Sequence, residues 1–209
     1  MSDRIVIIGA GGHGKVIADI ARKNGYTDIL FLDDNAAITE CGGYPTEGAC
    51  ELLSRYLDRD FVIAIGNPQT RRAFHEQIVE AGGNVVKLVH PGAVVGDGVT
   101  IGEGTVVMAG AVINPGTEIG RGAIINTCAS VDHDCRVGEF THISPGAHIA
   151  GTVRIGDRTW IGVGATVVNN VQITQDCIIG AGAVVVSDLL ESDTYVGVPA
   201  KAIKKKEYL

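Results

Sequence analysis

The stretch VVGDGVTIGEGTVVMAGAVINPGTEIGRGA, residues 94–123, contains five successive six-residue repeats. Each repeat has Val or Ile at its second position and a small or β-branched residue at its sixth. Steps of six from Val89 to Val185 meet Val or Ile at all 17 positions, without an insertion. Six is not a helical period, and β-branched residues fit strands, so the repeat predicts short strands at regular intervals.

The two rows of the repeat also predict how these strands pack. The residue four places after each Val or Ile is small or β-branched at every position except the last, Leu189. We expect a parallel β-solenoid in which each hexad forms one flat side, the aliphatic row stacks inside, and the small row lies near the corners. Cys135 and Cys177 belong to the small row, so we expect them to fill the interior rather than to carry out chemistry.

The composition excludes several classes of protein. A chain with 29 glycines and only 5% aromatic residues suits a fold with many tight turns. The net charge of −7 disfavours a nucleic-acid or membrane-surface role, and the basic run 201–206 is expected to be a solvated tail. No apolar run reaches the roughly 18 residues that a membrane span needs. The first residues show no leader pattern, and the five cysteines show no metal-ligand spacing, so we expect reduced thiols and a cytoplasmic protein.

The first 85 residues follow a different pattern, in which buried-strand runs alternate with helical ones. We expect an α/β domain with parallel strands, a Rossmann-like half domain. Its predicted strands are 4–9, 28–33 and 60–66, its helices are 14–25 and 68–82, and residues 84–89 lead into the solenoid. The predicted domains are therefore an α/β domain over 1–85, the solenoid over 86–190 and a C-terminal tail over 191–209.

The first strand ends in a glycine turn, Gly9-Ala-Gly-Gly-His-Gly14, which has the G-x-G-x-x-G spacing of dinucleotide sites. Asp33 and Asp34 follow about twenty residues later, where such sites place an acidic residue. However, a dinucleotide site needs two mononucleotide halves, and only one fits before the solenoid. A half-site can still hold a nucleotide diphosphate on the amides of the turn. The alternative is that the glycines serve only tight helix packing.

The two halves together resemble one family of hexapeptide-repeat sugar acetyltransferases. It includes UDP-4-amino-sugar N-acetyltransferases of the bacillosamine pathway and sialic acid O-acetyltransferases. The segments that carry the resemblance, besides the hexads, are GAGGHGKV (9–16), FLDD (31–34), AIGN (64–67), NTCASVDHDCRVGEFTHISPGAHIAG (126–151) and VGVPAK (196–201). The resemblance implies a left-handed parallel β-helix with three hexads per coil. It also implies a homotrimer that binds acetyl-CoA between adjacent β-helices and needs no metal.

The segment SVDHDCRVGEFT, residues 130–141, breaks the repeat with a charged turn. His133 lies outside both inward rows, so we expect its side chain to face outward. An imidazole titrates near neutral pH and can take a proton from an amine that attacks a thioester. By resemblance His133 is the general base and Asp134 its orienting partner. Adjacent strand residues point to opposite faces, so this contact requires a turn, and Asp132 is a competing partner. The alternative is a solvated polar corner.

The resemblance implies roles for further residues. Those expected to contact acetyl-CoA are His142, Gly151, Gly162, Val163, Gly180 and Ala181, with the Gly151 amide facing the thioester oxygen. Those expected to bind the nucleotide sugar are Gly11, Gly12, His13, Asp33, Asp34, Gly66 and Asn126. His142 lies nine residues after His133, which is half a coil, so the two should occupy different sides of the prism. They can share a site only between neighbouring chains.

The sequence thus predicts transfer of an acetyl group from acetyl-CoA to the amine of a nucleotide-linked amino sugar, of the UDP-4-amino-4,6-dideoxy type. Sialic acid O-acetylation and a non-catalytic, nucleotide-binding scaffold are the alternatives, and CMP or GDP sugars stay open. A β-helical zinc hydratase would need three convergent histidines, and the spacing of those in the solenoid does not match that family. Residues 40–50 are expected to be an irregular connection, either beside the nucleotide pocket or simply at the surface.

Overall fold

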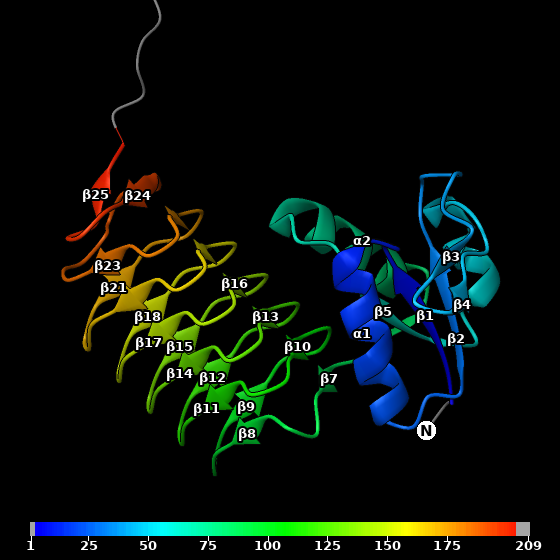
Figure 1. Ribbon diagram of the computed structural model, residues 1–209, viewed down its shortest axis with the longest axis horizontal. Helices are drawn as coiled ribbons and strands as arrows, with labels where there is room; N and C mark the ends of the chain where they lie inside the picture. Colours follow the sequence, from blue (N-terminus) through cyan, green and yellow to red (C-terminus); the bar gives the residue numbers. More distant parts are fainter. Residues whose placement is uncertain (1–2, 204–209) are drawn as a thin grey trace, which may run out of the picture.

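The computed structural model describes residues 3–203, and it places an α/β part and a β-solenoid side by side along the long axis (Figure 1). The α/β part holds a four-stranded parallel sheet in the order β2-β1-β5-β6, with two helices. Its elements are β1 Arg4–Ile8, α1 Gly12–Lys23, β2 Asp28–Leu32, β5 Asp60–Ile63, α2 Pro68–Glu80 and β6 Asn84–Val85. The predicted alternation of strands and helices is confirmed, with strand and helix boundaries in the sheet that differ by at most three residues.

Helix α1 joins the two parts of the molecule. Its buried face includes Ile17 and Ala21, and its C-terminal end is followed by Gly25, whose φ of +96° few other residues adopt. Leu88, at the start of the solenoid, belongs to the same hydrophobic cluster as Ile17. The outward residue Ile124, two coils later, belongs to it as well. The α/β part therefore covers the first coils of one side of the solenoid and leaves the later coils of that side open.

The solenoid consists of seventeen two-residue strands, β7 to β23, which confirms every position of the predicted repeat. They are β7 Leu88–Val89, β8 Val94–Val95, β9 Thr100–Ile101, β10 Val106–Val107, β11 Val112–Ile113, β12 Glu118–Ile119, β13 Ile124–Ile125, β14 Ser130–Val131, β15 Arg136–Val137, β16 His142–Ile143, β17 His148–Ile149, β18 Arg154–Ile155, β19 Trp160–Ile161, β20 Thr166–Val167, β21 Gln172–Ile173, β22 Ile178–Ile179 and β23 Val184–Val185. Strands three apart pair in parallel, so that Val107 lies beside Ile125 and Ile125 beside Ile143. One coil therefore takes 18 residues, as the resemblance implied.

The coils have three flat sides, which are sheets of five, six and eight strands, all parallel except for one antiparallel edge pair in the eight-stranded sheet. The aliphatic row stacks inside them as one continuous core, together with the small row. Cys135 and Cys177 are fully buried there, as predicted. Small-row hydroxyls satisfy buried carbonyls, as where Thr105 Oγ1 donates to Gly120 O at 2.8 Å. The interior is thus filled by buried side chains, and any chemistry must use the outer faces and corners.

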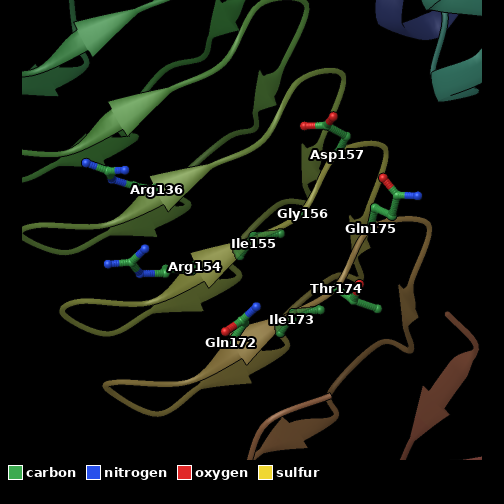
Figure 2. A pocket seen from close by; sticks show the side chains of 9 residues that line it. All are labelled: Arg136, Arg154, Ile155, Gly156, Asp157, Gln172, Ile173, Thr174 and Gln175. Atoms are coloured by element: carbon green, nitrogen blue, oxygen red, sulfur yellow. The ribbon is translucent and has the colours of Figure 1, made fainter. Parts of the chain in front are cut away.

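The outer face of the five-stranded side is polar (Figure 2). Arg136 and Arg154 are paired across β15 and β18 and project to the same side as Gln172. With neighbouring residues they line an open cavity of about 400 Å³. Arg136 also pairs with Glu118 at 3.3 Å. None of the residues that we expect to act in catalysis or ligand binding lines this cavity.

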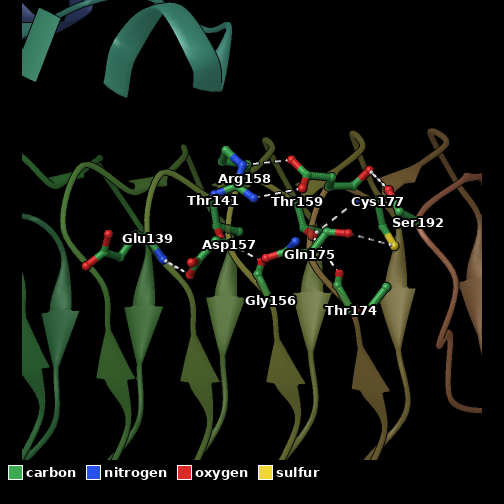
Figure 3. A network of polar contacts seen from close by, with 11 residues as sticks. Glu139, Thr141, Gly156, Asp157, Arg158, Thr159, Thr174, Gln175, Cys177 and Ser192 are labelled. Atoms are coloured by element: carbon green, nitrogen blue, oxygen red, sulfur yellow. Dashed lines mark hydrogen bonds and ion pairs between the residues drawn. The ribbon is translucent and has the colours of Figure 1, made fainter. Parts of the chain in front are cut away.

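The corners of the solenoid repeat one backbone feature every six residues. From Gly98 to Gly182 each such position has a left-handed φ between 54° and 74°, and seven of them are not glycine. At one corner Arg158 occupies such a position and bonds through two nitrogens to Asp176, one coil later, at 2.8 and 2.7 Å (Figure 3). Contacts between equivalent residues of successive coils, including this ion pair, offset part of the strain of a non-glycine residue at such positions.

Two segments depart from the predicted local structure. Within residues 40–50, expected to be irregular, β3 Glu40–Cys41 and β4 Tyr44–Pro45 form an antiparallel hairpin, which is followed by the 3₁₀-helix η1 Cys50–Tyr56. In the predicted tail, β24 Thr194–Val196 and β25 Lys201–Ala202 extend the eight-stranded side. Of the basic run 201–206, residues 204–206 lie outside the described residues. No helix in the described range 3–203 is long and apolar enough to cross a membrane.

Candidate active site

His133 lies on the corner between the six-stranded and the five-stranded side, in the turn that links β14 to β15. Its Nδ1 lies 2.8 Å from Oδ2 of Asp134. Asp134 has a φ of 58°, and this left-handed turn lets two consecutive side chains meet. Asp132 is already engaged, because its Oδ1 accepts the backbone N–H of His133 at 2.8 Å and the side-chain amide of Asn114 at 2.7 Å. The structure therefore pairs the imidazole with Asp134, while Asp132 stabilises the turn.

The charges around His133 favour its protonated form. The hydrogen bond to Asp134 raises the pKa of His133; desolvation opposes this rise, and the charges of Asp132 and Asp134 add to it. In the neutral ring, Nδ1–H donates to the carboxylate, so the lone pair lies on Nε2. The side chain is 56% exposed. The imidazole is thus a proton acceptor that a ligand on the outside of the coil can reach.

Gly151 lies directly beyond Nε2 of His133, one coil later on the same corner. A Cβ added at Gly151 would lie 2.6 Å from Nε2, so any other residue would push the ring aside. The N–H of Gly151 donates to no acceptor in the described part of the chain. The next residue, Thr152, holds the coils in register by donating its N–H to the carbonyl of His133 at 2.9 Å. A proton acceptor and a free backbone donor therefore lie side by side.

His142 lies on the eight-stranded side, which is opposite the His133 corner in the triangular coil. It stacks on Trp160, with ring centroids 5.3 Å apart. The side-chain oxygen of Asn126 accepts the N–H of Thr127, so its amide nitrogen faces Nε2 of His142 at 3.0 Å. Burial, and then the charges of Arg71 and His13, lower the pKa of His142 to about 3. This imidazole is therefore neutral, with the proton on Nδ1, a buried atom that has no partner among residues 3–203.

An apolar groove of about 320 Å³ begins beside this stack and runs toward the later coils. It brings together four of the predicted acetyl-CoA residues, namely Gly162, Val163, Gly180 and Ala181. Trp160 forms one wall and donates its indole N–H to Ser144 Oγ at 2.8 Å. The other two predicted acetyl-CoA residues lie elsewhere: His142 behind Trp160, and Gly151 on the opposite corner.

The glycine turn of the α/β part leaves open space where a ligand would need it. A Cβ at Gly11 or Gly12 would meet nothing within 4 Å, whereas at Gly14 it would lie 2.4 Å from the carbonyl oxygen of Gly9. Close helix packing therefore explains Gly14 but not Gly11 or Gly12. Burial, and then the charge of Arg71, lower the pKa of His13 to about 4. This turn thus presents free space next to a neutral imidazole.

The two predicted nucleoside carboxylates are already hydrogen-bonded within the chain. Asp33 accepts the backbone N–H of Ala10 at 2.7 Å and of Asn35 at 2.8 Å, through one oxygen each. Asp34 Oδ1 accepts the N–H of Cys50 at 2.8 Å. Asp33 therefore holds the glycine turn itself, and Asp34 holds the start of η1. The hairpin adjoins the same turn, because Cys41 Sγ lies 3.6 Å from the carbonyl oxygen of Gly11.

The sequence did not single out two residues that the structure places at these sites, Trp160 and Arg71. Trp160 is the only tryptophan in the chain and holds an outward position of the repeat, which was a usable signal. Arg71 lies on the buried stripe of α2, which also holds Pro68, His75 and Ile78. The usable signal for Arg71 was that two polar residues, Arg71 and His75, lie on a helix face that is expected to be buried. No group of three His, Cys, Asp or Glu side chains suited to a metal occurs in the part of the chain that the structure describes.

Comparison with known proteins agrees with this arrangement. Residues 4–78 match the PglD N-terminal domain, and residues 98–133 and 152–187 match the bacterial transferase hexapeptide (six repeats). The acetyltransferase domain of PglB from Neisseria gonorrhoeae FA1090, also solved with acetyl coenzyme A, superposes with a TM-score of 0.93 at 40% identity, over 97% of this chain and 100% of that one. The left-handed β-helix that the sequence predicted is thereby confirmed.

Two further proteins extend the comparison. PerB from Caulobacter crescentus, solved with CoA and GDP-perosamine, has a TM-score of 0.91 at 41% identity, over 96% of this chain and 97% of that one. UDP-N-acetylbacillosamine N-acetyltransferase of Bacillus subtilis is 35% identical over 110 residues, or 50% of this chain. The match spans only about half of the curated relatives' own length, 51% in this case. Since the solved relatives are covered almost completely, the chain belongs to the family of hexapeptide-repeat sugar acetyltransferases with a PglD N-terminal domain.

Proposed function

We propose that the chain transfers the acetyl group of acetyl-CoA to the amine of a nucleotide-linked amino sugar. The observation that carries this proposal is the pair His133–Asp134, exposed on a corner with the free N–H of Gly151 beside it. Acyl transfer to an amine needs a base for the amine proton and a donor for the thioester oxygen, and this corner supplies both. The relatives solved with acetyl-CoA, or with CoA and GDP-perosamine, support the two substrates.

In the proposed reaction, Nε2 of His133 removes a proton from the amine as its nitrogen bonds to the thioester carbon. The electron pair of the carbonyl moves to oxygen, toward the N–H of Gly151. Asp134 stabilises the imidazolium through Nδ1–H. When the carbonyl re-forms, the C–S bond breaks and the thiolate takes the proton from the imidazolium, which leaves an N-acetyl sugar, free CoA and a neutral base. One histidine thus carries the transferred proton from the amine to the leaving thiolate.

We place the complete site between two chains of a homotrimer. In one chain the His133 corner lies opposite the side that carries the apolar groove and the α/β part. A second copy that lays its eight-stranded side against this corner would bring Gly162, Val163, Gly180 and Ala181 to the base. The nucleotide would then bind at Gly11, Gly12 and His13, with Asp33, Asp34 and Gly66 shaping the pocket and Asn126 acting on the sugar side. The five free cysteines fit a reducing, cytoplasmic compartment.

Sialic acid O-acetylation would use the same base, so the corner alone does not decide between the two acceptors. The names of the relatives favour the amine, because they act on bacillosamine- and perosamine-type amino sugars. The names also leave both UDP and GDP as the nucleotide. We propose the UDP-4-amino-4,6-dideoxy sugar first, and the GDP-linked amino sugar second.

The deciding experiment follows free thiol release from acetyl-CoA with a small panel of acceptors. The panel contains a UDP-4-amino-4,6-dideoxy sugar, GDP-perosamine, free sialic acid and CMP-sialic acid. We expect turnover with an amino sugar and none with either sialic acid. Turnover with sialic acid alone would reject the proposal, and no turnover with any acceptor, from a folded protein that binds UDP or GDP, would favour a binding scaffold.

A further inference from the structure

Arg71 connects the α/β part to the solenoid through four hydrogen bonds from a single side chain. It is 1% exposed. Its Nη1 donates to the carbonyl oxygens of Ile65 and Gly66, both at 2.8 Å. Its Nε donates to Gly122 O at 2.7 Å, and its Nη2 to Phe140 O at 2.5 Å. Four of the five guanidinium N–H groups thus bind carbonyls that belong to two different parts of the fold.

The two solenoid carbonyls occupy equivalent corner positions on successive coils. Gly122 and Phe140 are 18 residues apart, and both have a left-handed φ, of 61° and 54°. The Phe140 ring fills the space where a side chain at 122 would lie, since a Cβ there would meet the ring at 2.3 Å. His75 packs edge-on against the same ring, with centroids 5.6 Å apart. The guanidinium therefore binds a rigid, fully packed corner.

The carbonyls at the other end belong to the nucleotide side. Ile65 and Gly66 follow β5 at the carboxyl edge of the sheet, next to the glycine turn, where a Cβ at Gly9 would lie 3.3 Å from the Ile65 side chain. On the solenoid side, Phe140 lies at the corner two residues before β16, whose His142 stacks on Trp160. Arg71 thus ties the proposed nucleotide pocket to the strand beside the proposed acetyl-CoA groove.

The electrostatics agree with this central position. The charge of Arg71 contributes, after burial, to the lowered pKa of both His13 and His142, one from each side of the junction. Burial lowers the pKa of Arg71 itself to about 10, so the side chain still carries its charge at neutral pH. A lysine would keep the charge but has three donors on one nitrogen and cannot span two pairs of carbonyls.

We propose that Arg71 is a positioning residue for acetyl transfer, which fixes the nucleotide pocket at the correct place relative to the β-helix. This inference rests on the proposed function. It predicts an asymmetric effect, because the apolar groove is built from solenoid residues alone, whereas the proposed nucleotide pocket includes Gly66, in the loop that Arg71 holds. Loss of the guanidinium should weaken the use of the nucleotide sugar and leave the use of acetyl-CoA nearly unchanged.

The test compares Arg71→Lys with wild type by steady-state kinetics, and Arg72→Met is the matched control. Arg72 is the adjacent arginine on α2, but it is exposed and pairs only with Glu76 on the same helix among the described residues. For Arg71→Lys we expect the KM for the amino sugar to rise about tenfold or more and the KM for acetyl-CoA to stay within about twofold. Arg72→Met should match wild type in both.

Binding affinities measured by calorimetry test the same difference between the nucleotide and CoA without turnover. Arg71→Lys should bind UDP, or GDP if the wild type prefers it, about tenfold more weakly, and CoA with unchanged affinity. Equal affinities in a folded Arg71→Lys would overturn the inference, and so would a parallel loss of both ligands, which a purely structural role produces. If the wild type binds nucleotide but acetylates no amino sugar, the proposed function fails and these affinities still decide the role of Arg71. Arg71→Met, if it folds, should enlarge the same asymmetry.

Discussion

Two imidazoles, nine residues apart on the same repeat, have opposite electrostatic environments. His133 stands on an exposed corner, and its bond to Asp134 raises its pKa. His142 lies under the α/β part against Trp160, and burial lowers its pKa to about 3. His133 lies in a corner turn, whereas His142 is the first residue of strand β16 on a flat side. What separates a proton acceptor from a neutral ring is therefore its place on the coil, together with its covering and its partner.

The comparison also supports the proposal that the complete site lies between two chains. The ring that can take a proton faces away from the α/β part, and the ring that lies beside the apolar groove cannot be protonated at physiological pH. The proposed interface between copies would bring the two environments into one site. Substitutions that remove one histidine or change its neighbours therefore test whether His133 and His142 have different roles.

The largest effect is expected for His133→Ala. Loss of the base should lower kcat by about a hundredfold to ten-thousandfold, while the KM for acetyl-CoA changes little. Thiol release at saturating substrate measures this directly. His90→Asn is the control, because His90 accepts the N–H of Gly92 in a turn and asparagine can do the same. A His133→Ala variant with near-wild-type kcat would remove the proposed base.

The second effect is expected for Gly151→Ala. The new methyl group would lie 2.6 Å from Nε2 of His133 and force the ring away from the attacking amine. A displacement of this size should lower kcat/KM by about a hundredfold. Gly151 itself is buried, but the exposed His133 ring can rotate into solvent to make room for the methyl group, so the melting temperature should stay close to wild type. Unchanged kinetics in a folded variant would show that the ring does not act from the position seen here.

The third effect is expected for Asp134→Asn, and it appears in the pH profile. Activity needs neutral His133, so it falls as the pH drops below the raised pKa of this ring. The amide cannot raise that pKa, so the acidic limb of kcat/KM should move to lower pH, and the maximal rate should fall about tenfold. Asparagine tolerates the left-handed turn at this position, so the backbone should be kept. An acidic limb that does not move would contradict the pairing.

The smallest effect is an absence of titration at His142. With a pKa of about 3, its ring resonances should stay constant from about pH 5 to pH 9 in a selectively labelled protein, while those of His133 shift. The ¹⁵N shifts should report a proton on Nδ1, because Asn126 donates to Nε2. The resonance that is missing from the His142→Gln variant is assigned to His142. A titration near neutral pH would show that this ring is not sealed by its surroundings.

The repeat made the solenoid predictable to the residue. Each Val or Ile from Val89 to Val185 is the second residue of a strand, because inward stacking repeats the same steric demand on every coil. The helices were placed to within two residues, since α2 begins at an Asn–Pro pair whose asparagine caps it. The hairpin at 40–45 was missed because two-residue strands around Gly42 and Gly43 carry no periodic signal.

The site was predictable where the repeat itself defines position. The outward placement of His133 and the turn required by its contact with Asp134 both follow from the register of the coil. The role of Arg71 could not be deduced, because it depends on the carbonyls of Gly122 and Phe140, 51 and 69 residues away along the chain. The amide of Asn126, a residue that we expect on the sugar side, also faces His142, and only the folded side shows that neighbour.

Gly151 occupies on its own coil the same place that His133 occupies one coil earlier. The histidine ring occupies the space that a side chain at position 151 would fill, so its present position requires glycine there. At this corner the imidazole keeps its position only because the following coil has no side chain there. Other corners do hold large side chains on successive coils, as Arg158 and Asp176 show, so an empty neighbouring position is a requirement of this ring and not of the solenoid as a whole.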